Sequence, residues 1–194
     1  MTEKEKMLRG MLYDADDSAL SADRVRAKEL CHAYNQLRPS DAAGMRELLR
    51  RLLGKTGETF CVTAPFWCDY GYNIRLGEYF YANHNLVILD CAAVTFGEHV
   101  FVAPNCGFYT AGHPIDAECR ERGLEDAYPI TVGDHVWIGG GVQVMPGVTI
   151  GSNVVIGGGS VVVKDIPSDS VAVGNPCRVI RPITEADKQT CWDR

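Results

Sequence analysis

The sequence predicts a mainly β fold: a parallel β-helix of six-residue repeats with an N-terminal helical appendage and an extruded loop. Three observations predict it. Aliphatic residues recur every six positions from about residue 60 onward. Residues 1–54 instead place apolar side chains at helical spacing, and the six-residue period stops after Phe108 and returns only near Val132. A period of six with many β-branched residues does not fit the helical period of about 3.6.

Residues 1–55 are expected to form a helical cap. Thr2 and Glu5 have the spacing of a capping box, which marks the start of a first short helix. Ser21 can cap a second helix that ends at Pro39, and a third amphipathic segment follows. About 50 residues are too few to bury an independent core, so these helices should pack against the rest of the chain.

The repeat occupies residues 60–181. In its clearest run, ITVGDHVWIGGGVQVMPGVTIGSNVVIGGGSVVVKD, aliphatic residues stand six apart without a slip: Val132, Ile138, Val144, Ile150, Ile156 and Val162. Each hexad is interpreted as one short strand and one turn, and three hexads make one triangular coil. Residues 18 apart therefore stack on neighbouring coils, at a spacing of ~4.8 Å. We expect the aliphatic side chains to form one continuous internal column.

The segment at about residues 110–129, TAGHPIDAECRERGLEDAYP, has no aliphatic period and is polar and rich in turn residues. It should project from the helix as a long loop, and long loops on rigid scaffolds are where function concentrates. His113 stands at the root of this loop, followed by Pro114. On its own, a loop histidine is more often solvated than catalytic. We expect residues 182–194 to form a C-terminal tail.

Composition limits the class of protein. The 194 residues suit one substantial domain with a small appendage, and the net charge of −6 argues against nucleic acid or an anionic membrane as partner. The first residues do not resemble a signal peptide, and no apolar run approaches the ~20 residues of a membrane span, so we expect a cytoplasmic protein. Eight cysteines occur without a C-x-x-C pair, and we interpret them as buried thiols.

Four segments carry a close resemblance: YGYNIRLGEYFYANHNLVILD, TAGHPID, PITVGDHVWIGGGVQVMPGVTIG and GNPCRVIR. They resemble the maltose and galactoside O-acetyltransferases of the hexapeptide-repeat acyltransferase family, and CDYG at 68–71 with LDC at 89–91 favours the maltose type. The resemblance implies a left-handed coil, which the period itself does not determine. It also implies acetyl transfer from acetyl-CoA to a hydroxyl of a sugar such as maltose or glucose, by a homotrimer whose active sites are shared between subunits.

The resemblance assigns catalytic and acceptor-binding positions. His113 matches the family's catalytic histidine, and a histidine can act as general base because its reference pKa is ~6.5. The activated alcohol would attack the thioester directly in a ternary complex, so no serine or cysteine nucleophile is required. Asn83 and Asp69 match acceptor-binding residues, although each could simply occupy a turn. Cys91 matches an acceptor-site carboxylate of the galactoside branch, which leaves the acceptor's identity open.

On the cofactor side, the resemblance assigns seven positions: Trp137, Gly140, Gly158, Val163, Lys164, Arg178 and Arg181. Gly140 and Gly158 are 18 apart and should stack on successive coils, which suits an extended pantetheine arm. The three basic residues can neutralise the CoA phosphates, or they can be ordinary surface charges. Acetyl-CoA is thus the expected co-substrate, and no metal is required.

Several points stay open. In the family an acid near the first helix contacts the acceptor; here Ala15 stands at that position, between Asp14 and Asp16, whose role is undetermined. Six aromatic residues could line the acceptor pocket, form a subunit interface or fill the core: Phe66, Trp67, Tyr70, Tyr72, Phe80 and Tyr81. The acceptor could instead be a galactoside, a chito-oligosaccharide or an antibiotic alcohol. A zinc enzyme resembling carbonic anhydrases of the same scaffold, or an inactive scaffold, are further alternatives.

Overall fold

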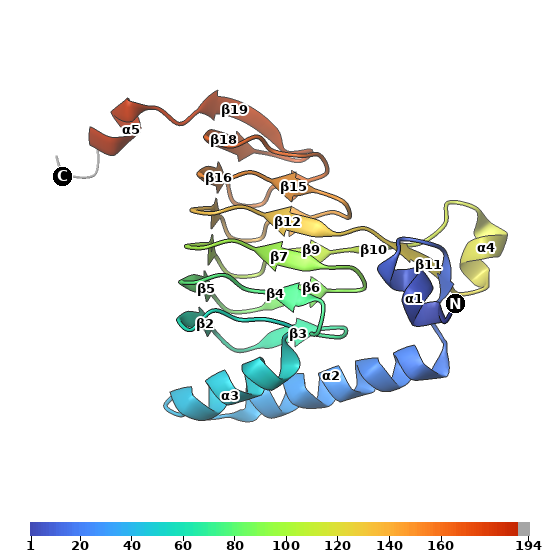
Figure 1. Cartoon of the computed structure of the whole chain (residues 1–194). Helices are drawn as coiled ribbons and strands as arrows, with labels where there is room; N and C mark the ends of the chain where they lie inside the picture. Colours follow the sequence, from blue (N-terminus) through green and yellow to red (C-terminus); the bar gives the residue numbers. More distant parts are fainter. Residues whose placement is uncertain (190–194) are drawn as a thin grey trace.

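The structure is a computed structural model in which residues 1–189 are described. It confirms the predicted fold, since a left-handed β-helix stands on a pair of N-terminal helices and a separate substructure projects from one side (Figure 1). Residues 190–194 of the predicted C-terminal tail, with Cys191, lie outside the described residues. Among the described helices, none combines the length and the apolar character that crossing a bilayer requires.

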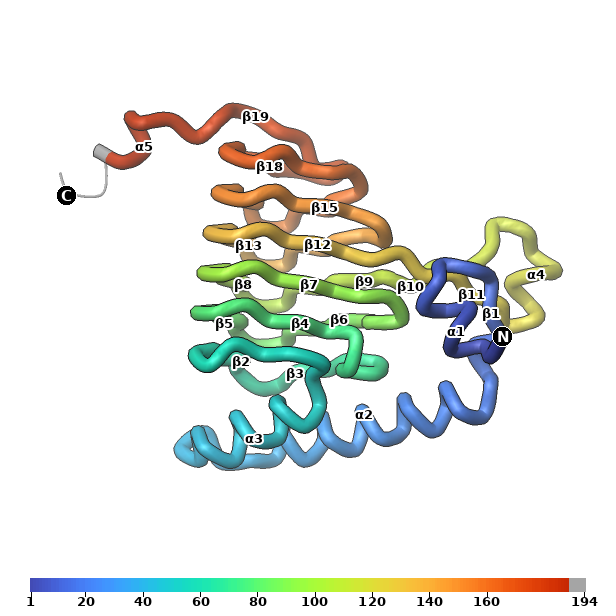
Figure 2. Tube along the Cα trace, viewed as in Figure 1, coloured from blue at the N-terminus to red at the C-terminus, as the bar shows by residue number. Residues whose placement is uncertain are grey.

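The strands form three flat faces. Face 1 holds β4 (Ile74–Arg75), β7 (Val94–Phe96), β12 (Ile130–Val132) and β15 (Thr149–Ile150). Face 2 holds β2 (Phe60–Val62), β5 (Phe80–Ala82), β8 (Phe101–Val102), β13 (Trp137–Ile138), β16 (Val154–Ile156) and β18 (Ser170–Val173), which pairs with the antiparallel β19 (Arg178–Pro182). Face 3 holds β3 (Phe66–Cys68), β6 (Leu86–Leu89), β9 (Gly107–Tyr109), β14 (Gln143–Val144) and β17 (Val161–Val162). The chain runs from face 1 to face 2 to face 3 in each coil (Figure 2).

The register confirms stacking at a spacing of 18 residues. Val132 pairs with Ile150 on face 1, and the corresponding pairs on the other faces are Ile138 with Ile156 and Val144 with Val162. All six are at most 1% exposed, so the predicted internal column exists. The aromatic residues divide between inside and outside: Phe66, Tyr70 and Phe80 are buried, Tyr72 is partly buried, and Trp67 and Tyr81 face outward.

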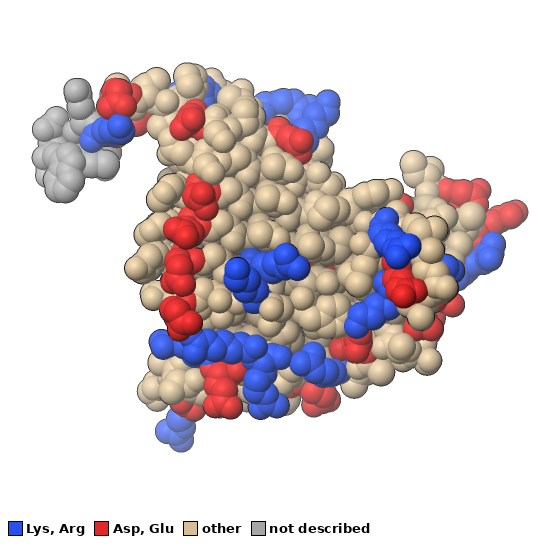
Figure 3. All heavy atoms as spheres, viewed as in Figure 1, with Lys and Arg blue, Asp and Glu red and all other residues tan. Residues whose placement is uncertain are grey.

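The faces meet at three corners, named here by the faces they join. At the 1/2 corner a non-glycine residue of each turn takes a positive φ of 54–57°, in Tyr79, His99, His135, Asn153 and Asp169. Acidic side chains of these turns follow one edge of the molecule (Figure 3). They bond to the neighbouring coil: Glu78 accepts from the N–H groups of Glu58 and Thr59, and Asp134 accepts from the N–H of Glu98. This acidic row therefore supports the stacking of coils.

The helices cover the first coil. They are α1 (Glu3–Leu8), α2 (Ser18–Gln36) and α3 (Ala42–Leu52), and α2 and α3 pack under β2 and β3. The capping box of Thr2 and Glu5 is present. The expectation for Ser21 is wrong: Asp17 caps α2 by accepting from the N–H groups of Ala19 and Leu20, so the helix starts earlier. Asp17 is the N-cap because its carboxylate accepts hydrogen bonds from two otherwise free N–H groups of the first turn.

The segment at 110–129 is more regular than a loop. It contains β10 (Ala111–Gly112), α4 (Ala117–Glu121) and β11 (Leu124–Ala127), and β11 pairs with both β10 and β1 (Tyr13–Asp14). The resulting three-stranded antiparallel sheet projects from the 3/1 corner (Figure 1). The chain ends its described part in α5 (Glu185–Gln189).

The cysteines are mostly buried thiols, as predicted. Those at positions 31, 68, 91, 106 and 177 are buried and free. Cys61 is exposed and Cys119 is partly exposed, so the expectation is wrong for these two. Cys61 occupies an outward position of β2, and Cys119 lies in the projecting helix α4, where nothing covers it fully.

Candidate active site

His113 directly follows β10 at the root of the projecting sheet. Its side chain is 54% exposed, its Nδ1 lies 3.4 Å from the carbonyl oxygen of Leu124, and its Nε2 lies 3.8 Å from Oε1 of Glu125. A carbonyl oxygen only accepts, so this contact selects the tautomer with the proton on Nδ1. Nε2 then keeps its lone pair and is available to take a proton.

Three residues lie in one row across the projecting sheet. Tyr13 pairs with Glu125 in the ladder of β1 and β11, and Gly112 pairs with Asp126 in the ladder of β10 and β11. His113, one step beyond Gly112, is therefore opposite Glu125. The hydroxyl of Tyr13 donates to Oε2 of Glu125 at 2.6 Å. Burial raises the pKa of Tyr13 well above its usual range, so this hydroxyl remains a donor.

Cys91 and Asp69 are linked to this row through the hydroxyl of Tyr13. The Cys91 thiol lies 3.8 Å from Oδ2 of Asp69 and also interacts with the hydroxyl of Tyr13. Burial raises the pKa of Cys91 to about 12, so the thiol is neutral near pH 7 and is not poised as a nucleophile. Burial also raises the pKa of Asp69, against the opposing charges of Lys28 and Arg24.

Two residues that sequence reasoning missed, Asp90 and Arg24, fix the segments around Asp69 by hydrogen bonds. Asp90 is fully buried and accepts from the backbone N–H groups of Asp69, Tyr70 and Asn73, which fixes the turn that carries Asp69. Its signal was a lone carboxylate after the aliphatic run LVIL. Arg24 of α2 donates to the hydroxyl of Tyr70 at 2.8 Å and to the carbonyl of Ala15 at 2.6 Å.

The N-terminal carboxylates lie near this region but on its surface. Asp14 and Asp16 are both exposed, and Oδ1 of Asp14 accepts from the N–H of Asp16 at 2.9 Å. This bond shapes the turn between β1 and α2. Within residues 1–189, neither carboxylate makes a hydrogen bond or ion pair with His113.

The remaining predicted residues lie at two corners. Asn83, Gly140 and Gly158 are at the 2/3 corner, where the N–H of Gly159 donates to the carbonyl of Gly140 at 2.8 Å. Oδ1 of Asn83 accepts from the N–H of His84 at 2.8 Å. Val163 and Lys164 are exposed at the 3/1 corner, above the root of the projecting sheet.

Three predicted cofactor residues lie elsewhere. Trp137 is 55% exposed on face 2. Arg178 and Arg181 both belong to β19, and the guanidinium of Arg181 makes two 2.9 Å bonds to the carboxylate of Asp187. Within one chain, His113, Asp69 and Cys91 thus lie at the 3/1 corner, whereas Asn83 and the stacked glycines lie at the 2/3 corner.

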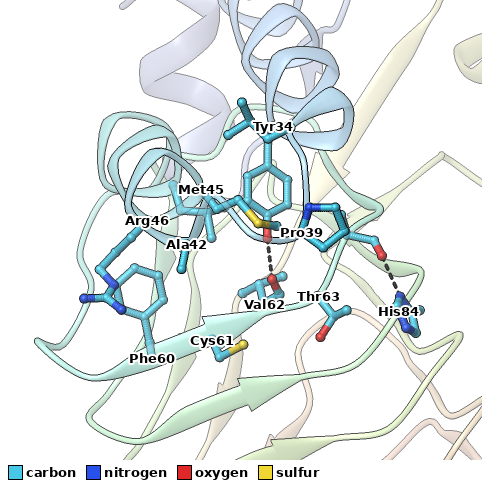
Figure 4. A pocket seen from close by; sticks show the side chains of 13 residues that line it. Tyr34, Pro39, Ala42, Met45, Arg46, Phe60, Cys61, Val62, Thr63 and His84 are labelled. Atoms are coloured by element: carbon cyan, nitrogen blue, oxygen red, sulfur yellow. Dashed lines mark hydrogen bonds between the residues drawn. The ribbon is translucent and has the colours of Figure 1, made fainter.

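An apolar cavity of about 320 Å³ lies apart from all these residues, between the two long helices and the first coil (Figure 4). Tyr34 and Met45 come from the helices, Phe60 and Val62 come from the first coil, and His84 comes from the turn after β5 in the second coil. The hydroxyl of Tyr34 donates to the carbonyl of Val62, and Nδ1 of His84 lies 2.6 Å from the carbonyl of Ala64. The cavity contains none of the predicted site residues.

Comparisons with known proteins place this geometry in a family. The maltose acetyltransferase hexapeptide capping motif matches residues 6–57, and the bacterial transferase hexapeptide motif of six repeats matches residues 129–164. A Saccharomyces cerevisiae protein provisionally named an acetyltransferase is 56% identical over 187 residues, which is 96% of this chain and 95% of that protein. A Staphylococcus aureus protein with the same provisional name is 50% identical over 184 residues, covering 94% and 92%.

Solved structures agree. A maltose O-acetyltransferase from Clostridium difficile 630 has a TM-score of 0.94 at 50% identity, covering 95% of this chain and 99% of its own. A galactoside acetyltransferase in complex with coenzyme A has a TM-score of 0.94 at 43% identity, covering 97% and 94%. A Vibrio cholerae hexapeptide-repeat acetyltransferase complexed with acetyl coenzyme A has a TM-score of 0.88 at 39% identity, covering 95% and 100%. The chain belongs to the maltose and galactoside O-acetyltransferase family of hexapeptide-repeat acyltransferases.

Proposed function

We propose that this protein transfers the acetyl group of acetyl-CoA to a hydroxyl of a sugar such as maltose or glucose, with His113 as general base. The observation that carries the proposal is the state of the His113 ring. The carbonyl oxygen of Leu124 accepts a hydrogen bond from Nδ1–H of His113, which leaves the lone pair on Nε2. Asp69 and Cys91 lie at the same 3/1 corner as His113. Relatives of the family have been solved with coenzyme A or acetyl-CoA bound.

The chemistry needs one base and no covalent intermediate. The acceptor hydroxyl gives its proton to Nε2 of His113 while its oxygen attacks the thioester carbonyl. The tetrahedral intermediate collapses, the carbon–sulfur bond breaks, and the CoA thiolate takes the proton from the histidine. The neutral thiol of Cys91 is a poor nucleophile, which favours direct attack over an acetyl-cysteine route.

The acceptor side is built from polar groups. The Asp69 carboxylate can accept hydrogen bonds from sugar hydroxyls, because among the described residues its side chain receives a hydrogen bond only from the weak thiol donor of Cys91. The Asn83 amide, which both donates and accepts, would complete the acceptor site from a second copy of the chain.

The cofactor side is a strip of accessible backbone. A Cβ added at Gly140 would meet one atom within 4 Å, the carbonyl oxygen of Pro104 at 3.5 Å, so a pantetheine arm could lie against the backbone here without displacing a side chain. Trp137 offers an exposed ring beside it, and Val163 and Lys164 offer an apolar contact and a charge for CoA. Arg178 and Arg181 are further candidates for the phosphates, and no step requires a metal.

A homotrimer would unite the two halves of the site. The base lies at the 3/1 corner and the stacked glycines at the 2/3 corner, so a head-to-tail contact between copies would bring one of each together. Such contacts close into rings when the rotation fits. The outward side chains of face 2 include Tyr81, Phe101 and Trp137, which are 36–55% exposed and form an apolar strip suited to such a contact.

The test is acceptor-dependent thiol release from acetyl-CoA. The panel contains maltose, glucose, a thiogalactoside and a chito-oligosaccharide, and wild type is compared with His113→Ala. Release with maltose or glucose that falls by about 100-fold or more in the variant is the expected result. Full activity in the variant would remove His113 as the base. A preference for the thiogalactoside or the chito-oligosaccharide would change the proposed acceptor and leave the proposed reaction, acetyl transfer from acetyl-CoA, unchanged.

A further inference from the structure

A carboxylate lies beside the nitrogen that would act as base. Glu125 occupies the middle of the row that joins Tyr13 to His113, and its side chain is only 21% exposed. Within residues 1–189, His113 is the one basic side chain within 4 Å of this carboxylate. Arg24, the nearby guanidinium, is engaged by the Tyr70 hydroxyl and the Ala15 carbonyl instead.

We infer that Glu125 is a positioning residue for the transfer reaction: its negative charge stabilises His113 when the ring becomes an imidazolium. The inference rests on the proposed function. The acceptor proton moves to Nε2 and later to the CoA thiolate, and Glu125 takes no part in this transfer: it exchanges no proton and forms no bond to substrate.

The distance favours this role over a direct hydrogen bond. At 3.8 Å the Oε1–Nε2 separation exceeds the hydrogen-bond range, so the carboxylate leaves the Nε2 lone pair open to the acceptor hydroxyl. It is still close enough for the carboxylate to attract a positive charge on the ring, and the Glu125 side chain is only 21% exposed. The arrangement differs from a hydrolase triad, in which the carboxylate contacts the Nδ1 side. Here the Leu124 carbonyl occupies that side.

A hydrogen bond from Tyr13 fixes the orientation of the Glu125 carboxylate. Oε2 accepts from the hydroxyl of Tyr13, whose side chain is 1% exposed and belongs to the strand opposite. This bond turns the other oxygen, Oε1, toward His113. A preset charge needs no rearrangement when the proton arrives, which is the condition under which electrostatic stabilisation is most effective.

The experiment compares Glu125→Gln and Glu125→Asp with wild type, using the acceptor that the panel identifies. Glu118→Gln is the matched control, because Glu118 is an exposed carboxylate on the same projecting segment. Glu125→Gln keeps the shape and removes the charge, so kcat should fall about tenfold to 100-fold. The KM values for acetyl-CoA and acceptor should stay within about twofold, since neither substrate's ground-state binding uses this charge.

The aspartate variant separates charge from shape. It keeps the charge but shortens the side chain, so its kcat should lie between those of wild type and Glu125→Gln. A structural role predicts the reverse order, with the isosteric glutamine closer to wild type. The inference would be overturned if Glu125→Gln kept a higher kcat than Glu125→Asp. It would also be overturned if kcat were unchanged in both variants, or if only the KM for the acceptor rose. Loss of activity in His113→Ala with normal Glu125→Gln would reject only the inference, whereas an active His113→Ala would reject the proposed base itself.

Discussion

The hydroxyl of Tyr13 donates to Oε2 of Glu125 across a sequence separation of 112 residues, and the two residues face each other on paired antiparallel strands. The N-terminal appendage therefore does more than cover the first coil of the β-helix. It supplies β1, one strand of the projecting sheet, and the buried side chain of Tyr13. His113 lies at the root of the same sheet.

Replacing Tyr13 with phenylalanine keeps the ring and removes two contacts of the hydroxyl, the bond to Glu125 and the interaction with the Cys91 thiol. We expect the free energy of unfolding to fall by about 1 kcal/mol and kcat to fall several-fold, because Oε1 of Glu125 is no longer held toward His113. Tyr72→Phe is the control: its hydroxyl bonds to Asp23 at 3.1 Å, outside this row, so it should cost similar stability and leave kcat alone. Urea unfolding and steady-state kinetics measure both. Equal kcat values in the two variants would contradict the prediction.

Asp90 should make stability depend on pH. Burial raises its pKa to about 6 in the folded protein, above the ~3.9 of an unfolded chain. Between these values the folded state binds more protons than the unfolded state, so this residue's contribution to stability falls as pH rises through the window. Each unit of difference is worth about 1.4 kcal/mol.

Chemical denaturation of wild type and Asp90→Asn from pH 4 to pH 7 checks this. The variant lacks the titrating group, so the stability of wild type minus that of the variant should be greatest near pH 4. That difference should decline by about 2 kcal/mol toward pH 7, because at pH 4 the carboxyl of the unfolded chain is already partly ionised. Parallel curves for the two proteins would mean that Asp90 does not titrate in this range.

Two adjacent glycines should respond differently to alanine. A Cβ at Gly139 would lie 2.6 Å from the backbone nitrogen of Gly158, so Gly139→Ala should destabilise the stacked coils by about 1–3 kcal/mol. A Cβ at Gly140 meets nothing closer than 3.5 Å and should leave the melting temperature unchanged. Because it enters the space proposed for the pantetheine arm, Gly140→Ala should raise the KM for acetyl-CoA several-fold. An unchanged KM would place the cofactor elsewhere.

The internal column should dominate stability. Ile150 is fully buried between Val132 and Ile166, and Ile150→Ala should cost about 2–5 kcal/mol because it removes apolar contacts and leaves a cavity. Thr149, next to it on β15, faces outward, so Thr149→Ala should stay within about 0.5 kcal/mol. Thermal or denaturant unfolding of the pair tests the assignment of inward and outward positions; similar losses would argue against it.

The β-helix could be predicted because each six-residue repeat shows in its own sequence which side chain points inward. Each hexad repeats the same inward position, so the period alone places Val132 under Ile150. The site was only partly predictable. His113, Asp69 and Cys91 came from motif resemblance, whereas the pairing of Tyr13 with Glu125 joins distant segments that share no period. The same limit applies to Asp90, whose partners become visible only once the turn at residues 69–73 is folded.

In the projecting sheet, β10 and β11 are joined by a tip that contains α4, and the proposed base, His113, directly follows β10. Ladder pairs fix Gly112 and Asp126, while the tip between Pro114 and Gly123 lies in solvent, with Ile115 97% exposed. Insertions or deletions in this tip would leave the strand register untouched, because both ladders begin beyond it. Changes in tip length would therefore add or remove surface next to the proposed site, and the acceptor could change while the position of the proposed base, His113, stays the same.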